Sequence, residues 1–121
     1  MAIVLIVEED KIFSKPLTET LRKSGYEVEI AADGATALKI LPAVHPDLII
    51  LDLVLPEMHG LEFLRKIQEP ASEFKNIPVV ILSNLTGDED SIKKMGLEVA
   101  GYFIKTKTSL KEFIAQIKSI L

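Results

Sequence analysis

The chain has 121 residues, of which 48% are hydrophobic and 26% charged, so we expect a single domain over residues 1–121 with a substantial hydrophobic core. Eighteen acidic and 14 basic side chains give a formal charge of -4, which argues against nucleic-acid binding through a basic face. The chain contains no cysteine, which excludes disulfides and thiolate metal sites. It shows neither a signal-peptide pattern nor an apolar run of about 20 residues, so we expect a cytoplasmic protein without membrane contact.

Five short segments have the composition of β-strands. Apolar runs at 3–7, 47–52, 77–82 and 102–104 are typical of strands buried on both faces of a sheet. Residues 26–30 instead alternate between polar and apolar side chains, which predicts a half-exposed edge strand.

Helical spacing of apolar residues first occurs at 11–24, and Gly25 then provides a C-terminal cap. Pro16 lies inside this pattern and lacks an amide donor, so we expect the helix to kink there or to begin near Ser14. The buried stripe of this helix is expected to hold Ile12, Leu17 and Leu21.

Four further helices are predicted between and after the remaining strands. The second opens at Asp33-Gly34 and is expected to stop before Pro42. The others cover 60–69, 87–95 and 108–121. Their inward residues are expected to be Leu61, Leu64 and Ile67 in the first of these, Ile92 and Met95 in the second, and Leu110, Phe113, Ile114 and Ile117 in the last.

Strand and helix therefore alternate five times along the chain. This order predicts an α/β fold of the flavodoxin-like type, (βα)5, with a doubly wound parallel sheet of five strands in the order 2-1-3-4-5. In such sheets a ligand sits at the carboxyl ends of the strands where the strand order reverses, here between the first and third strands.

Acidic residues follow both of these central strands. Glu8, Glu9 and Asp10 follow the first, and Asp52 follows the third. Because clustered carboxylates need a cation, a partner or a proton, this arrangement predicts a cation site. For Asp10 we favour a role as the N-terminal cap of the first helix over direct metal ligation.

A hydroxyl and an ammonium group are expected at the same edge of the sheet. Ser83 ends the fourth strand and Lys105 ends the fifth. Acids, a metal ion, Ser83 and Lys105 together suit phosphoryl chemistry with a carboxylate nucleophile. His45 and His59 lack metal-ligand spacing and are assigned no role.

Over essentially its whole length the chain resembles the response-regulator receiver domain, the phosphoacceptor module of two-component signalling. Each matching segment is weak alone, but four of them occur in order at the expected strand ends. They are VLIVEED at 4–10, DLVLPEMHG at 52–60, PVVILS at 78–83 and GYFIK at 101–105.

The resemblance implies a role for each residue of the site. Asp52 would be the phosphoacceptor. Mg²⁺ (or Mn²⁺) would be held by Glu8, Glu9, Asp52 and the backbone carbonyl of Val54. Lys105 would pair with Asp52 at rest and with the phosphoryl group afterwards.

The resemblance also implies a conformational switch and a set of partners. Ser83 would move towards the phosphoryl oxygen and Tyr102 would turn inward, so that the face formed by the fourth helix, fifth strand and fifth helix reads out the change. The donor would be a histidine kinase or a phosphotransfer protein, and the output a downstream protein partner bound by a monomer or a phosphorylation-dependent dimer. The chain would promote its own phosphorylation and dephosphorylation without a separate substrate, so it is not expected to be an enzyme in the usual sense.

Two positions depart from the family pattern. Glu9 replaces an aspartate, which adds one methylene at a metal site with strict geometry. Thr106 replaces a proline, so we expect a trans Lys105-Thr106 bond and a reshaped loop. These departures motivate an alternative function, a phosphorylation-independent pseudo-receiver that acts as a protein-interaction module.

A third class of function is an enzyme or cofactor carrier built on the same sheet. An aspartyl phosphatase needs a second aspartate two residues after the nucleophile, but this position is Val54. A flavin carrier needs a phosphate-binding loop after the first strand, where this chain has acids.

Overall fold

Strands and helices alternate through the whole chain in a computed structural model that describes residues 1–84 and 88–121. Each predicted strand and helix is present. The strands are β1 Ile3–Val7, β2 Glu27–Ala31, β3 Leu48–Leu51, β4 Val79–Ser83 and β5 Gly101–Ile104. The helices are α1 Lys11–Lys23, α2 Gly34–Val44, α3 Gly60–Ile67, α4 Asp88–Lys94 and α5 Leu110–Ile120, with a 3-10 turn at Lys105–Lys107.

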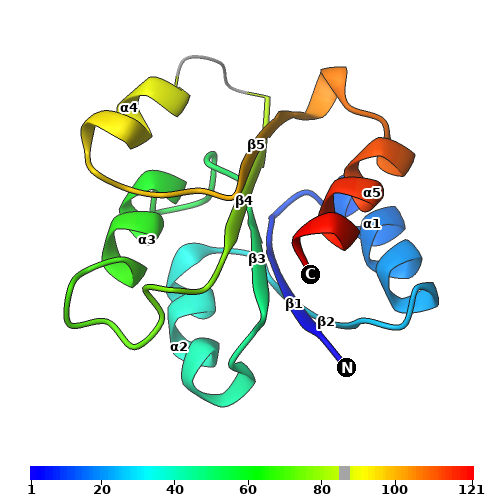
Figure 1. Ribbon diagram of the computed structural model, residues 1–121, viewed down its shortest axis with the longest axis horizontal. Coiled ribbons are helices and arrows are strands. Elements are labelled where there is room, and N and C mark those ends of the chain that lie inside the picture. Colours follow the sequence, from blue (N-terminus) through cyan, green and yellow to red (C-terminus); the bar gives the residue numbers. More distant parts are fainter. Residues whose placement is uncertain (85–87) are drawn as a thin grey trace.

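The five strands form one sheet in the order β2-β1-β3-β4-β5, and every neighbouring pair is parallel. Both the fold class and the strand order predicted from the sequence are confirmed. Helices α1 and α5 cover one face of the sheet, and α2, α3 and α4 cover the other (Figure 1). β2 is an edge strand with two buried and three exposed residues, so the predicted half-exposed edge strand is present, but Ile30 is exposed and Ala31 is buried, which breaks the expected alternation.

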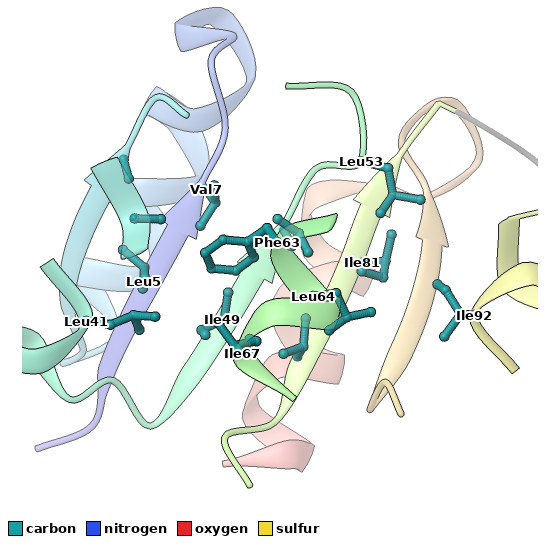
Figure 2. Packing of buried hydrophobic residues seen from close by; sticks show 14 residues of the cluster. Leu5, Val7, Leu41, Ile49, Leu53, Phe63, Leu64, Ile67, Ile81 and Ile92 are labelled. Atoms are coloured by element: carbon teal, nitrogen blue, oxygen red, sulfur yellow. The ribbon is translucent and has the colours of Figure 1, made fainter. Parts of the chain in front are cut away.

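Alternate residues of the central strands supply two separate cores. In β1, Leu5 and Val7 face α2 and α3, whereas Val4 and Ile6 face α1 and α5. Figure 2 shows the first core, in which Phe63 of α3 lies against the sheet. The apolar strands are therefore buried on both faces, and they hold the carboxyl ends of β1 and β3 side by side.

Neither internal proline interrupts its helix, contrary to our expectation. α1 begins at Lys11 and runs through Pro16, and α2 runs through Pro42 to Val44, where His45 caps it with φ of 45°. Both proline rings are exposed, so the carbonyl groups that lose a backbone donor lie on the solvent side. Packing of each helix on the sheet outweighs the loss of one hydrogen bond.

Three residues expected in the core are exposed. Ile12 is 89% exposed because it lies in the first turn of α1, where Ser14 rather than Ile12 faces the sheet. Met95 is 46% exposed because α4 ends one residue earlier, and Leu110, the first residue of α5, is 38% exposed. Helical spacing alone overestimates burial at the helix ends. The expected start of α4, residue 87, lies outside the described residues.

A side-chain amide connects α3 to the segment that leads into β5. The Gln68 Nε2 donates to the Glu98 carbonyl at 2.7 Å, and the Glu98 amide donates to Gln68 Oε1 at 2.9 Å. Gln68 thus pairs with this backbone as a neighbouring strand would. None of the helices in the described ranges is long and apolar enough to cross a membrane.

Candidate phosphoacceptor site

The carboxyl ends of β1, β3, β4 and β5 surround a recess of about 250 Å³. It lies at the reversal of strand order, where the sequence places the ligand site. Three chain segments that are far apart in sequence contribute acids and one lysine to it. The lining residues are Glu8, Glu9, Asp10, Asp52, Val54, Asn84 and Lys105.

Asp52 is the residue directly after β3, and it is only 7% exposed. Its backbone amide donates to the Val7 carbonyl at 3.0 Å, which continues the β1–β3 pairing for one further residue. The Val54 amide donates to Asp52 Oδ1 at 3.2 Å, and Lys105 Nζ donates to Oδ2 at 3.1 Å. The carboxylate is therefore held in one orientation at the floor of the recess.

Lys105 is shared between two carboxylates, of which the sequence indicated only one. Its Nζ donates to Glu8 Oε2 at 2.8 Å as well as to Asp52, and its side chain is only 10% exposed. The Nζ also lies 4.6 Å from the ring centroid of Phe13. Neither the Glu8 pair nor the Phe13 contact could be read from strand ends alone.

The electrostatics of the site show an excess of negative charge. Burial and the nearby Asp52 charge raise the pKa of Glu8 to about 7, although Lys105 and the Asp10 amide donate to it. Burial lowers the pKa of Lys105, but its hydrogen bond to Glu8 and the charges of Glu8 and Asp52 outweigh burial and raise this pKa overall. One ammonium group thus faces two nearly buried carboxylates, and Glu9 and Asp10 add two more acidic side chains to the recess.

The oxygen-rich lining fits a hard divalent cation such as Mg²⁺, which prefers carboxylate and carbonyl ligands. The expected ligands Glu8, Glu9, Asp52 and Val54 all line the recess. In residues 1–84 and 88–121, however, no three acidic or histidine side chains are grouped closely enough to hold a metal ion. Glu8 is hydrogen-bonded to Lys105 and Glu9 is exposed, so holding a metal ion with both would require their carboxylates to turn towards Asp52.

Asp10, which lines the recess, and His59, which precedes α3, both cap helices. Asp10 Oδ1 accepts from the Ile12 amide at 3.0 Å, which confirms Asp10 as the cap of α1. His59, to which we assigned no role, caps α3 through Nδ1, which accepts from the Leu61 amide at 3.1 Å. Its position directly before Gly60, where the helix begins, was the signal that could have indicated this role.

Gly60 allows the loop after β3 to fold back beneath Asp52. Its amide donates to the Leu53 carbonyl at 2.8 Å. A Cβ at this position would lie 2.6 Å from the Asp52 carbonyl oxygen and 2.6 Å from Leu53 Cα. Only glycine fits such a close approach of two backbone segments.

The two residues expected to switch lie on neighbouring strands. Ser83 ends β4 and is fully buried, and Tyr102 lies in β5 and is partly buried. Burial, followed by the charges of Asp88 and Glu89 in α4, raises the pKa of the Tyr102 hydroxyl. Asn84, which we had not assigned, lines the recess. The Lys105-Thr106 bond is trans, as expected.

A parallel (βα)5 sheet with a nearly buried aspartate and a paired lysine at its carboxyl edge defines a flavodoxin-like α/β module with a charged site at the reversal of strand order. The sequence pattern of the response regulator receiver domain matches residues 4–118. The chain belongs to this family, and it is the receiver domain of a response regulator in two-component signalling.

Similar proteins support this assignment. The chain is 35% identical over 120 residues to the polar-differentiation response regulator DivK of Brucella ovis, with 98% of this chain and 94% of DivK covered. The chemotaxis protein CheY4 of Vibrio cholerae superposes with a TM-score of 0.86 at 29% identity, and the match covers 100% of this chain and 99% of CheY4. The Mn²⁺-bound response regulator Rcp1 superposes with a TM-score of 0.78 at 32% identity, covering 96% of this chain and 89% of Rcp1.

Proposed function

We propose that Asp52 accepts a phosphoryl group from the phosphohistidine of a histidine kinase or phosphotransfer protein, in a reaction that depends on Mg²⁺ or Mn²⁺. The observation that carries this proposal is the Asp52 carboxylate, nearly buried yet facing the recess, with Lys105 Nζ at 3.1 Å. In the transfer a carboxylate oxygen forms a bond to phosphorus, the phosphorus–nitrogen bond breaks, and the histidine leaves.

The chain itself would supply orientation and charge for this step. The Val54 amide and Lys105 hold the Asp52 carboxylate, and Lys105 would neutralise charge that develops on the phosphoryl oxygens. Glu8, Glu9, Asp52 and the Val54 carbonyl would hold the divalent cation. When bound, the cation neutralises further charge on the phosphoryl oxygens.

Two side chains would transmit the effect of phosphorylation from the site to the surface. The Ser83 hydroxyl would donate to a phosphoryl oxygen, and Tyr102 would turn inward, so that the surface of α4, β5 and α5 changes. This surface would bind a downstream protein rather than nucleic acid, either as a monomer or as a phosphorylation-dependent dimer. We infer that the chain promotes its own phosphorylation and dephosphorylation and acts on no separate substrate.

Incubation with Mg²⁺ and acetyl phosphate tests this function directly. Intact mass spectrometry should show one phosphoryl adduct on the wild-type chain and none on Asp52→Asn, because the amide removes the nucleophilic oxygen. Beryllofluoride should bind the wild type in the same metal-dependent manner. A wild type that forms no adduct, or an Asp52→Asn chain that forms an equal one, would refute phosphorylation at this site.

The pseudo-receiver is the second candidate. It is favoured by the 2.8 Å contact between Glu8 and Lys105, by the exposure of Glu9 and by the lack of a preformed metal cluster in the described residues. In a pseudo-receiver the lysine would remain on the carboxylates permanently. Titration with Mg²⁺ separates the two functions, since no binding at millimolar metal supports the pseudo-receiver.

A further inference from the structure

We propose that Phe13 is a positioning residue that holds the Lys105 ammonium group on Glu8 and Asp52 through a cation–π contact, and so sets the competition between Lys105 and the divalent cation. This inference rests on the metal-dependent function proposed above. Phe13 comes from α1 and packs against the core on the opposite side of the sheet from α3.

The ammonium group of Lys105 has three N–H donors and two carboxylate partners. The third side of the ammonium group is turned to an aromatic ring rather than to an oxygen, since Nζ lies 4.6 Å from the Phe13 ring centroid. The negative face of an aromatic ring attracts a cation within about 6 Å, and more strongly where water is excluded. The Lys105 side chain is only 10% exposed, so the contact is largely desolvated.

The position of Phe13 has two opposing consequences for the site. By stabilising Lys105 on Glu8 and Asp52, the ring keeps these carboxylates from turning to a metal ion, which weakens metal binding. By keeping the ammonium group beside Asp52, the same contact also places a positive charge where phosphoryl oxygens would arrive. Weakening the ring's attraction should therefore tighten metal binding and slow phosphorylation, whereas simple damage to the site would impair both.

Site-specific fluorination of Phe13 tests the proposal, because fluorine withdraws electrons from the ring face while keeping its shape. Phenylalanine is replaced in turn by its 4-fluoro, 3,4,5-trifluoro and pentafluoro forms. Across the series we expect the Mg²⁺ affinity measured by calorimetry to rise roughly three- to tenfold. At saturating Mg²⁺, the rate of phosphorylation by acetyl phosphate should fall.

A readout without metal or phosphate accompanies these measurements. The order parameter of the Lys105 Cε, measured by carbon relaxation in the metal-free protein, should fall along the same series. Fluorination of Phe103 is the matched control, since this ring packs edge-on against Phe113 at 5.4 Å rather than against Lys105. It should leave both the metal affinity and the lysine order unchanged.

The outcomes separate this inference from the proposed function. If the wild type binds Mg²⁺ and is phosphorylated but affinity and lysine order stay constant through the series, Phe13 does not position Lys105 and the receiver function stands. If the wild type binds no Mg²⁺, the metal-dependent function fails, and the lysine order alone decides whether the ring holds the ammonium group. An equal response from fluorinated Phe103 would also overturn the proposal.

Discussion

Glu8 and Asp52 share the single ammonium group of Lys105, at 2.8 and 3.1 Å, while Glu9 and Asp10 lie beside them on the same recess. That these carboxylates lie close together could be predicted from the sequence, because parallel strands end at one edge of a sheet. The pairing of both Glu8 and Asp52 with Lys105 could not be predicted, because it depends on side-chain rotamers and on the Phe13 ring next to Lys105. Glu8 is the closer of the two carboxylate partners of Lys105, and its role as a metal ligand stays a prediction.

The raised pKa of Glu8 predicts a pH-dependent stability. Its pKa is about 7 in the folded chain, above the ordinary value of 4.5, so the folded state binds the proton more tightly than the unfolded state. The stability contributed by this proton is fully present below about pH 4.5 and is lost as the pH rises through 7. Denaturant unfolding in a chelator should show this loss in the wild type and a flatter profile in Glu8→Gln.

The exposed Glu19 of α1 provides the control for this experiment. Glu19→Gln should keep the wild-type pH profile between 4.5 and 7. A Glu8→Gln profile parallel to that of the wild type would show that Glu8 is ionised normally in the folded chain. The explanation of the raised pKa of Glu8 by burial and the nearby Asp52 charge would then be wrong.

At the scale of elements, α3 is placed by the close approach of Gly60 to the backbone of Asp52 and Leu53. Gly60→Ala would bring a methyl group to 2.6 Å from two backbone atoms that cannot move without displacing Asp52. We expect a loss of about 1–3 kcal/mol in the free energy of unfolding, measured with denaturant, because overpacking at a rigid backbone forces it to shift. We also expect slower phosphorylation by acetyl phosphate.

Gly34 is a matched control for Gly60, because it is also buried and also begins a helix. The nearest atoms to a methyl group at Gly34 would all belong to the flexible Met58 side chain, the closest being its Sδ at 2.9 Å. Gly34→Ala should therefore be much less destabilising than Gly60→Ala. Equal losses in the two variants would argue that helix position, rather than the contact with Asp52, sets the requirement for glycine.

Element order and sheet topology could be predicted because each apolar run had one reasonable interpretation. The helix ends could not. Pro16 and Pro42 suggested interruptions that the packing of α1 and α2 overrides, and Ile12 fits the helical spacing but lies in a turn that projects into solvent. The spacing of apolar residues reports only helical periodicity. Burial of a residue at a helix end depends instead on whether the sheet extends beneath that end.

At the scale of the whole molecule, the proposed switch predicts a change in amide hydrogen exchange that is confined to α4 and β5. Ile92 is the only buried residue of α4 in the described part of the chain, so this helix is attached to the sheet more weakly than α3, which has four. With Mg²⁺ and beryllofluoride, we expect amide hydrogen exchange to slow in α4 and β5, because Ser83 would anchor the end of β4. Exchange in α2 should stay constant, and Asp52→Asn should show no change anywhere.

The double hydrogen bond between Gln68 and Glu98 determines how such a change could spread. It attaches the segment between α4 and β5 to the C-terminal end of α3, so α4 is anchored just after its last turn. If the proposed switch moves α4, a helix anchored at its C-terminal end would be displaced most at its acidic first turn, Asp88–Asp90. This displacement would expose or cover a patch of negative charge. The affinity of a partner with a basic contact surface would respond to it most strongly.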